Sequence, residues 1–78
     1  MDDFKTILRD GTTSFHVTFH KIRIPNGWKF YITLIHDGDI HTSFDMTKNG
    51  ESWKVVPPVP NWIREKENEL AEIINRNM

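Results

Sequence analysis

The sequence predicts a single α+β domain over residues 1–78: a short N-terminal helix, a four-stranded antiparallel meander, and a C-terminal amphipathic helix packed on one sheet face. Three turn signals divide the middle of the chain into segments in which apolar and polar residues alternate, as in half-buried strands. After the last turn the apolar residues change to helical spacing. A chain of 78 residues lies near the lower size limit for folding by burial alone, so one domain is expected.

The first element expected is a short helix between the N-terminal aspartates and Gly11. Asp2 or Asp3 can cap its first turn, and the glycine can end it. The apolar stripe of this helix would consist of Phe4, Ile7 and Leu8.

The meander follows from the turn residues. Asn26-Gly27 and Asn49-Gly50 favour two-residue type I′ turns, in which both central positions need positive φ. A loop with an odd number of residues, for instance 37–39, then joins the two hairpins in a consistent register. A slip of one residue would scatter the apolar residues over both faces. The face expected to form the core carries Phe15, Val17, Phe19, Phe30, Ile32, Leu34, Phe44, Met46, Trp53 and Val55.

The same register makes a prediction about charged residues. It places Asp45 opposite Lys54 and Lys48 opposite Glu51, which would be two favourable cross-strand ion pairs.

The stretch WKVVPPVPNWI, residues 53–63, contains two prolines at the PxxP spacing of polyproline ligands. It is better explained as the joint between the last strand and the helix. Prolines disfavour helical conformation at the residues before them, and Pro60 suits the first helical position. Trp53 and Trp62 would then both reach the core. The helix that follows has its apolar residues at Ile63, Leu70, Ile73 and Ile74, complementary to the apolar sheet face.

Composition and charge argue against several classes of function. The formal net charge of -1 is evenly spread, so there is no basic footprint for nucleic acid or an anionic membrane. The N-terminal MDDFKTILRDG lacks the apolar run of a signal peptide, and the longest apolar stretch, FYITLI, is far shorter than the roughly 20 residues that span a bilayer. Without cysteine there is neither a disulfide nor a zinc–thiolate site. We therefore expect a cytoplasmic protein that does not bind membranes.

No group of residues has the spacing of a catalytic or metal site. His16 and His20 share a strand face but are separated by about 13 Å of strand. His36 and His41 flank the middle turn and fall on opposite faces in the expected register. There is no G-x-S-x-G nucleophile turn and no glycine loop that could cradle phosphate. The sequence therefore predicts a protein that is not an enzyme and holds neither a metal nor a cofactor.

The reverse face of the sheet is the first candidate site. It carries Ile22, Ile24, Tyr31 and Ile35 among polar residues, and one C-terminal helix cannot cover both faces. Either the N-terminal helix covers this apolar cluster, or a protein partner or second copy of the chain does. The function expected is a small protein-interaction or binding domain that can self-associate through this face.

The first hairpin provides the alternative. Lys21, Arg23, Trp28 and Lys29 form a basic and aromatic cluster that could stack a base and contact phosphate. Nucleic-acid binding through these four residues is therefore the second hypothesis. The competing explanation is purely structural: Trp28 packs over the end of the sheet, and the three cations keep the strands soluble.

The C-terminal half resembles a group of small bacterial proteins of no known activity. The resemblance is carried by Phe44-Asp-Met, Trp53-Lys-Val, Pro60-Asn-Trp-Ile and the stripe of Leu70, Ile73 and Ile74, about half of the chain. It implies an antiparallel sheet with a C-terminal helix, and it implies no catalytic or binding residues.

Overall fold

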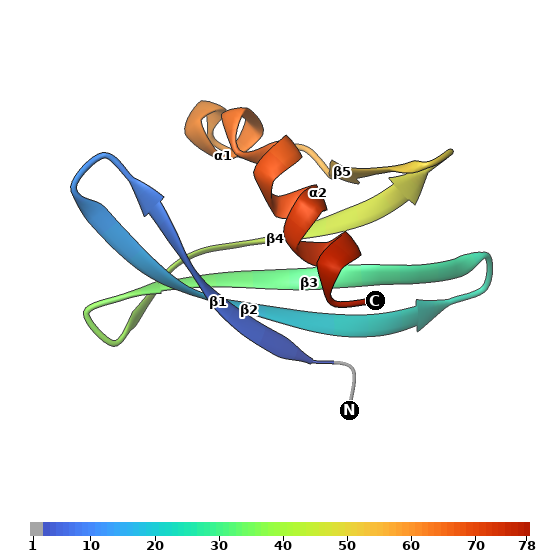
Figure 1. Ribbon diagram of the computed structural model, residues 1–78, viewed down its shortest axis with the longest axis horizontal. Coiled ribbons are helices and arrows are strands. Elements are labelled where there is room, and N and C mark those ends of the chain that lie inside the picture. Colours follow the sequence, from blue (N-terminus) through green and yellow to red (C-terminus); the bar gives the residue numbers. More distant parts are fainter. Residues whose placement is uncertain (1–2) are drawn as a thin grey trace.

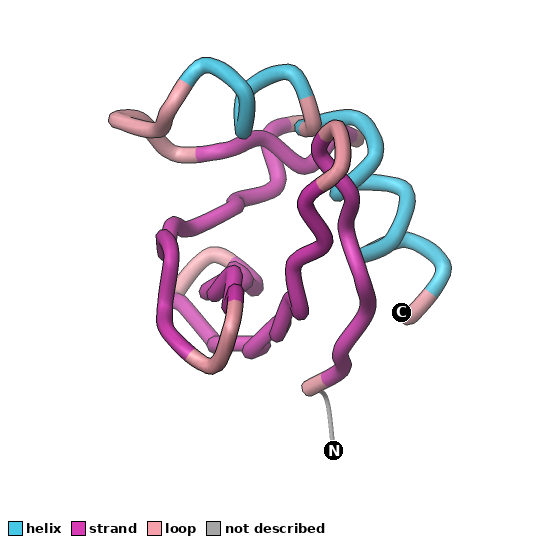
Figure 2. Tube along the Cα trace, turned by 90° about the vertical axis from the view of Figure 1, so that its left-hand side faces the viewer, coloured by secondary structure: helices cyan, strands magenta, loops and turns pink. Residues whose placement is uncertain are grey.

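The computed structural model describes residues 3–78 and contains a five-stranded antiparallel sheet followed by two helices (Figure 1). Each strand pairs with the next along the chain, which confirms a meander but with one strand more than expected. The sheet is strongly curled (Figure 2), and side chains of both helices pack against its inner side. The elements are β1 (Phe4–Asp10), β2 (Thr13–Ile24), β3 (Gly27–His36), β4 (Asp39–Asn49), β5 (Ser52–Val55), α1 (Asn61–Glu65) and α2 (Glu67–Arg76).

The expected N-terminal helix is wrong, because this segment forms the edge strand β1. Phe4 and Leu8 are four residues apart, a spacing that lies on one face of a helix and equally on one face of a strand. Here they point into the core, while Ile7 points outward and is 57% exposed. Gly11 has a φ of +63° and sits in the turn that joins β1 to β2. The proposed cap at Asp2 lies outside the described residues.

The two outer hairpins of the predicted meander turn one residue away from the expected positions. Ile24 pairs with Gly27, so the first turn is centred on Pro25-Asn26, and the last turn is centred on Gly50-Glu51. Proline fixes φ near the value required at the first central position of a type I turn, which favours the earlier placement. Moving a turn by one residue moves the pairing by two, and therefore every side chain keeps its face.

The middle hairpin has a two-residue turn in place of the odd loop. Asp37 and Gly38 have φ values of +53° and +82°, as a type I′ turn requires. The extra residue is absorbed by a β-bulge in β4, since Leu34 pairs with Thr42 and Ile35 with Ile40, leaving His41 unpaired between them.

The bulge also corrects the placement of two histidines. The rings of His36 and His41 both lie against Phe15, at centroid distances of 5.6 and 5.1 Å, so they share the inner face. The expectation that they lie on opposite faces assumed a regular ladder beside the turn.

The predicted core is confirmed. Nine of the ten residues expected on the inner face are buried, and Val55 is partly buried against them. Leu8 of β1 joins this cluster, as do the helical residues expected to cover it. Four aromatic residues form its densest part: Phe19 stacks on Phe4 at 4.6 Å, and Phe30 makes edge contacts with Phe4 at 5.7 Å and with Trp53 at 5.2 Å.

The proline segment joins β5 to α1, as expected, and Pro60 sits at the N-cap of α1 instead of its first turn. The single helix expected is divided in two at Lys66. Trp62 is half-buried and stacks on Phe15 with a centroid distance of 5.2 Å, whereas Trp53 is only 2% exposed.

Neither charged cross-strand pair forms, because the last hairpin pairs two residues further along. Asp45 lies instead 3.3 Å from the amine of Lys29, and Lys54 lies 3.6 Å from Glu67 of α2.

Truncating the two tryptophans should separate their roles. Trp53→Ala should reduce the free energy of unfolding by about 3–5 kcal/mol, since the ring is buried in the core. Trp62→Ala should cost roughly half as much, because part of that ring already faces solvent. Urea denaturation followed by circular dichroism would measure both. Equal losses would contradict the burial described above.

Candidate functional site

The outer face of the sheet, defined as the face opposite the core, is the first candidate site. It carries the four residues expected there: Tyr31 is 43% exposed, and Ile22, Ile24 and Ile35 are half-buried. The intramolecular lid expected for this face is the helix between the N-terminal aspartates and Gly11, and this segment extends the sheet as β1 instead. The described chain therefore leaves the face open.

The register places three isoleucines and one histidine in a line across the outer face. Ile7 pairs with His16, His16 with Ile35, and Ile35 with Ile40, so these four side chains cross four neighbouring strands. We call this line the isoleucine row. Ile7 and Ile40, at its ends, are 57% and 69% exposed.

Sequence reasoning missed the two ends of the row. Ile7 fits the apolar stripe of a helix with Phe4 and Leu8, and the adjacent apolar pair Ile7-Leu8 breaks the alternation that would indicate a strand. Ile40 precedes the bulge at His41, and the extra residue reverses the face on which it lies. No turn signal reveals a bulge in advance.

Several polar residues of the outer face are paired with one another, close to the row at Thr33 and Ser43 and further along the strands at Lys29 and Asp45. The hydroxyl of Ser43 donates to Thr33 at 3.4 Å, and Lys29 and Asp45 form an ion pair with an N–O distance of 3.3 Å. Polar groups that are already hydrogen-bonded or paired cost less free energy to bury against a partner than unpaired ones.

The basic and aromatic cluster is only partly assembled. Lys21 and Arg23 lie on the inner face beyond the core, with the Lys21 amine 4.4 Å and the Arg23 guanidinium carbon 5.6 Å from the centroid of the Trp28 ring. Both distances are within the range of cation–π contacts. Lys29 lies on the outer face with Asp45, so three of the four predicted residues come together and the fourth does not.

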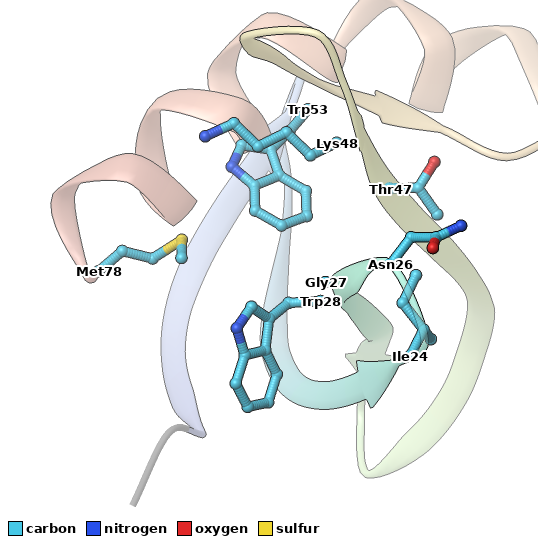
Figure 3. A pocket seen from close by; sticks show the side chains of 8 residues that line it. All are labelled: Ile24, Asn26, Gly27, Trp28, Thr47, Lys48, Trp53 and Met78. Atoms are coloured by element: carbon cyan, nitrogen blue, oxygen red, sulfur yellow. The ribbon is translucent and has the colours of Figure 1, made fainter.

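A pocket of about 400 Å³ lies beside this cluster (Figure 3). It opens where the β3–β4 register ends at Lys29 and Thr47, while the hairpins on either side continue past that point. Sequence reasoning did not foresee it, because the separation of two hairpin ends has no local sequence signal. The pocket is lined by Ile24, Asn26, Gly27, Trp28, Thr47, Lys48, Trp53 and Met78.

Between residues 3 and 78, no three side chains of His, Asp or Glu come close enough together to hold a metal ion. No helix in this part of the chain is long and apolar enough to cross a membrane. Comparisons with protein families, with curated proteins and with solved structures found no match to this chain.

Asp3 holds the start of β1 against β2. His20 Nδ1 donates to one carboxylate oxygen at 2.7 Å, and the backbone N–H of Lys21 donates to the other at 3.3 Å. The hydrogen bond from His20 is the main reason that the pKa of Asp3 lies below its ordinary value of 3.8. Because the folded pKa is lowered, this contact stabilises the fold above pH 3.8 and is lost as the pH falls through the folded pKa.

The His20→Ala variant should therefore raise the pKa of Asp3 toward 3.8, as measured by NMR titration of the side-chain carboxyl carbon. His16→Ala is the matched control, since His16 lies on the same face of β2 and pairs with Ile7 and Ile35. A pKa of Asp3 that is the same in both variants and the parent would contradict the assigned hydrogen bond.

Proposed function

We propose that this protein is a non-enzymatic interaction domain whose partner binds the outer face of the sheet. The isoleucine row carries the proposal, because two of its residues are more than half exposed in the described chain. Burying an isoleucine side chain completely contributes about 1.5–3 kcal/mol, so leaving two of them in water is unfavourable. Exposed apolar side chains surrounded by polar ones are typical of a protein-binding surface.

The partner we propose is a second copy of this chain. Closed two-fold dimers are the commonest form of homo-oligomer, and they use one self-complementary patch. A two-fold axis lying between two outer faces and crossing the row at its middle would set Ile7 of one copy against Ile40 of the other. The same axis would set His16 against Ile35, so each apolar end would meet an apolar end.

Static light scattering over a wide concentration range tests this proposal. The molar mass should rise from 9.2 kDa toward twice that value as the concentration increases. Ile40→Lys should raise the dissociation constant at least tenfold, because a charged amine would be buried in the seam. The residue is 69% exposed, so the substitution should leave the fold intact.

The control variant is Asn75→Lys, which adds the same charge at an exposed position of α2 and should dimerise like the parent. A mass of 9.2 kDa at every concentration would reject self-association. Equal dimerisation by both variants would show that the dimer interface lies outside the isoleucine row.

A second candidate function is binding of single-stranded nucleic acid. It is favoured by the contacts of Lys21 and Arg23 with the Trp28 ring, which place two cations beside an exposed aromatic side chain. Aromatic side chains stack on bases, and neighbouring cations contact phosphate. The same stretch, residues 20–30, contains no acidic residue.

For two phosphate contacts, the logarithm of the affinity for a single strand should fall with the logarithm of the salt concentration with a slope of about −1.4. Arg23→Glu should flatten this dependence and weaken binding, whereas Lys5→Glu, on the outer face of β1, should change little. Fluorescence anisotropy with a labelled oligonucleotide would measure both. Identical salt slopes for the two variants would exclude the cluster as the contact.

A further inference from the structure

The pocket beside the cluster contains a buried hydrogen-bond donor with no acceptor. Trp53 is 2% exposed, and its Nε1–H has no hydrogen-bond partner among residues 3–78. A buried donor without an acceptor costs free energy, so such groups are uncommon in folded proteins. In Figure 3 the indole nitrogens of Trp53 and Trp28 lie on the same side of their rings, the side on which Met78 approaches.

The walls of the pocket differ in character. Trp53 forms a buried aromatic wall, and Trp28, which is 38% exposed, forms a wall open to solvent. Lys48 pairs with Trp53 across the β4–β5 ladder, and its amine extends past that ring in Figure 3. Together with Lys21 and Arg23 over Trp28, three cationic side chains border two indole rings.

A ligand for this site must combine three properties. It needs a flat aromatic ring to contact the indoles, an acceptor atom for the Trp53 N–H, and negative charge for the cations. A volume of about 400 Å³ is within the range of small-molecule sites. A nucleotide has all three properties, since bases carry ring nitrogen and carbonyl acceptors and the phosphate is anionic.

We propose that the pocket between Trp28 and Trp53 binds one nucleotide. The base enters between the two indoles, displaces the exposed Met78 side chain and accepts a hydrogen bond from the buried Trp53 Nε1. The phosphate lies toward Lys48, which lines the pocket, and toward Lys21 and Arg23 beside the Trp28 ring. This inference deepens the second candidate function and rests on it for the choice of ligand. The nucleotide can be free or can belong to a single strand, because the recognised chemistry is the same.

The three tryptophans of the chain provide the test. Each gives one indole N–H signal in a ¹⁵N-labelled sample, and Trp62 is an internal control because it stacks on Phe15 and does not line the pocket. On titration with adenosine monophosphate, the Trp28 and Trp53 signals should shift and saturate while the Trp62 signal stays in place. Ribose 5-phosphate, which has the charge but no base, should produce much smaller shifts.

Two variants separate the parts of the site. Trp53→Phe keeps an aromatic wall but removes the N–H, and it should weaken nucleotide binding about tenfold. Trp28→Ala removes a stacking surface and should weaken it about 10- to 100-fold. Trp62→Phe is the matched control, because Trp62 does not line the pocket. Circular dichroism would confirm that each variant remains folded.

The possible outcomes distinguish this inference from the function on which it rests. Saturable shifts of Trp28 and Trp53 with the mononucleotide support the pocket, even where an oligonucleotide fails to bind and the second candidate function is rejected. Binding of an oligonucleotide that shifts Trp28 but not Trp53 would keep that function and overturn the pocket. Equal shifts with ribose 5-phosphate, or no shifts with any nucleotide, would also overturn it.

Discussion

The constraint on which the rest of this structure depends is that a chain of 78 residues can bury only one face of its sheet. The longest strands, β2, β3 and β4, direct their large apolar residues to the inner side, and the helical segment after β5 is long enough to cover only that side. Curling the sheet brings the aromatic contacts of Phe4, Phe19, Phe30 and Trp53 together. The outer face is left without a layer of its own, and so its apolar residues must be explained by something other than the core.

The inner face could be predicted from the sequence because successive side chains of a strand alternate between its two faces. An error of two residues in the strand pairing therefore leaves every side chain on its correct face. Both outer turns of the predicted meander were misplaced by one position, which moved the pairs without moving a side chain to the other face. An error of one residue moves side chains to the other face. The extra residue in the bulge at His41 therefore places Ile40 on the outer face and His41 against Phe15. The N-terminal segment failed for another reason, since Phe4 and Leu8 fit either period and the deciding factor was pairing with β2, a long-range contact.

The same distinction applies to the candidate sites. The outer positions of Ile22, Ile24, Tyr31 and Ile35 follow from alternation alone and were predictable. The grouping of Lys21, Arg23 and Trp28 could be predicted because they are close in the sequence. Lys29 is equally close, but strand alternation places it on the opposite face. The pocket depends on where two ladders end and on the approach of Met78 from the other end of the chain, and neither follows from local sequence.

The two proposed surfaces are compatible because they lie on different parts of the same sheet. The isoleucine row crosses the outer face near the β1–β2 and β3–β4 turns, whereas the pocket lies near the β2–β3 and β4–β5 turns, at the other end of the sheet in Figure 1. Strand alternation isolates them further, since Trp28 and Trp53 point away from the face that carries the row. A dimer formed through the row would therefore leave both pockets open. Two linked pockets bind a ligand with repeated units more tightly than one pocket does, because the second contact is intramolecular. Self-association through the isoleucine row would thus raise the affinity of the pockets for single-stranded nucleic acid, without any direct contact between the two sites.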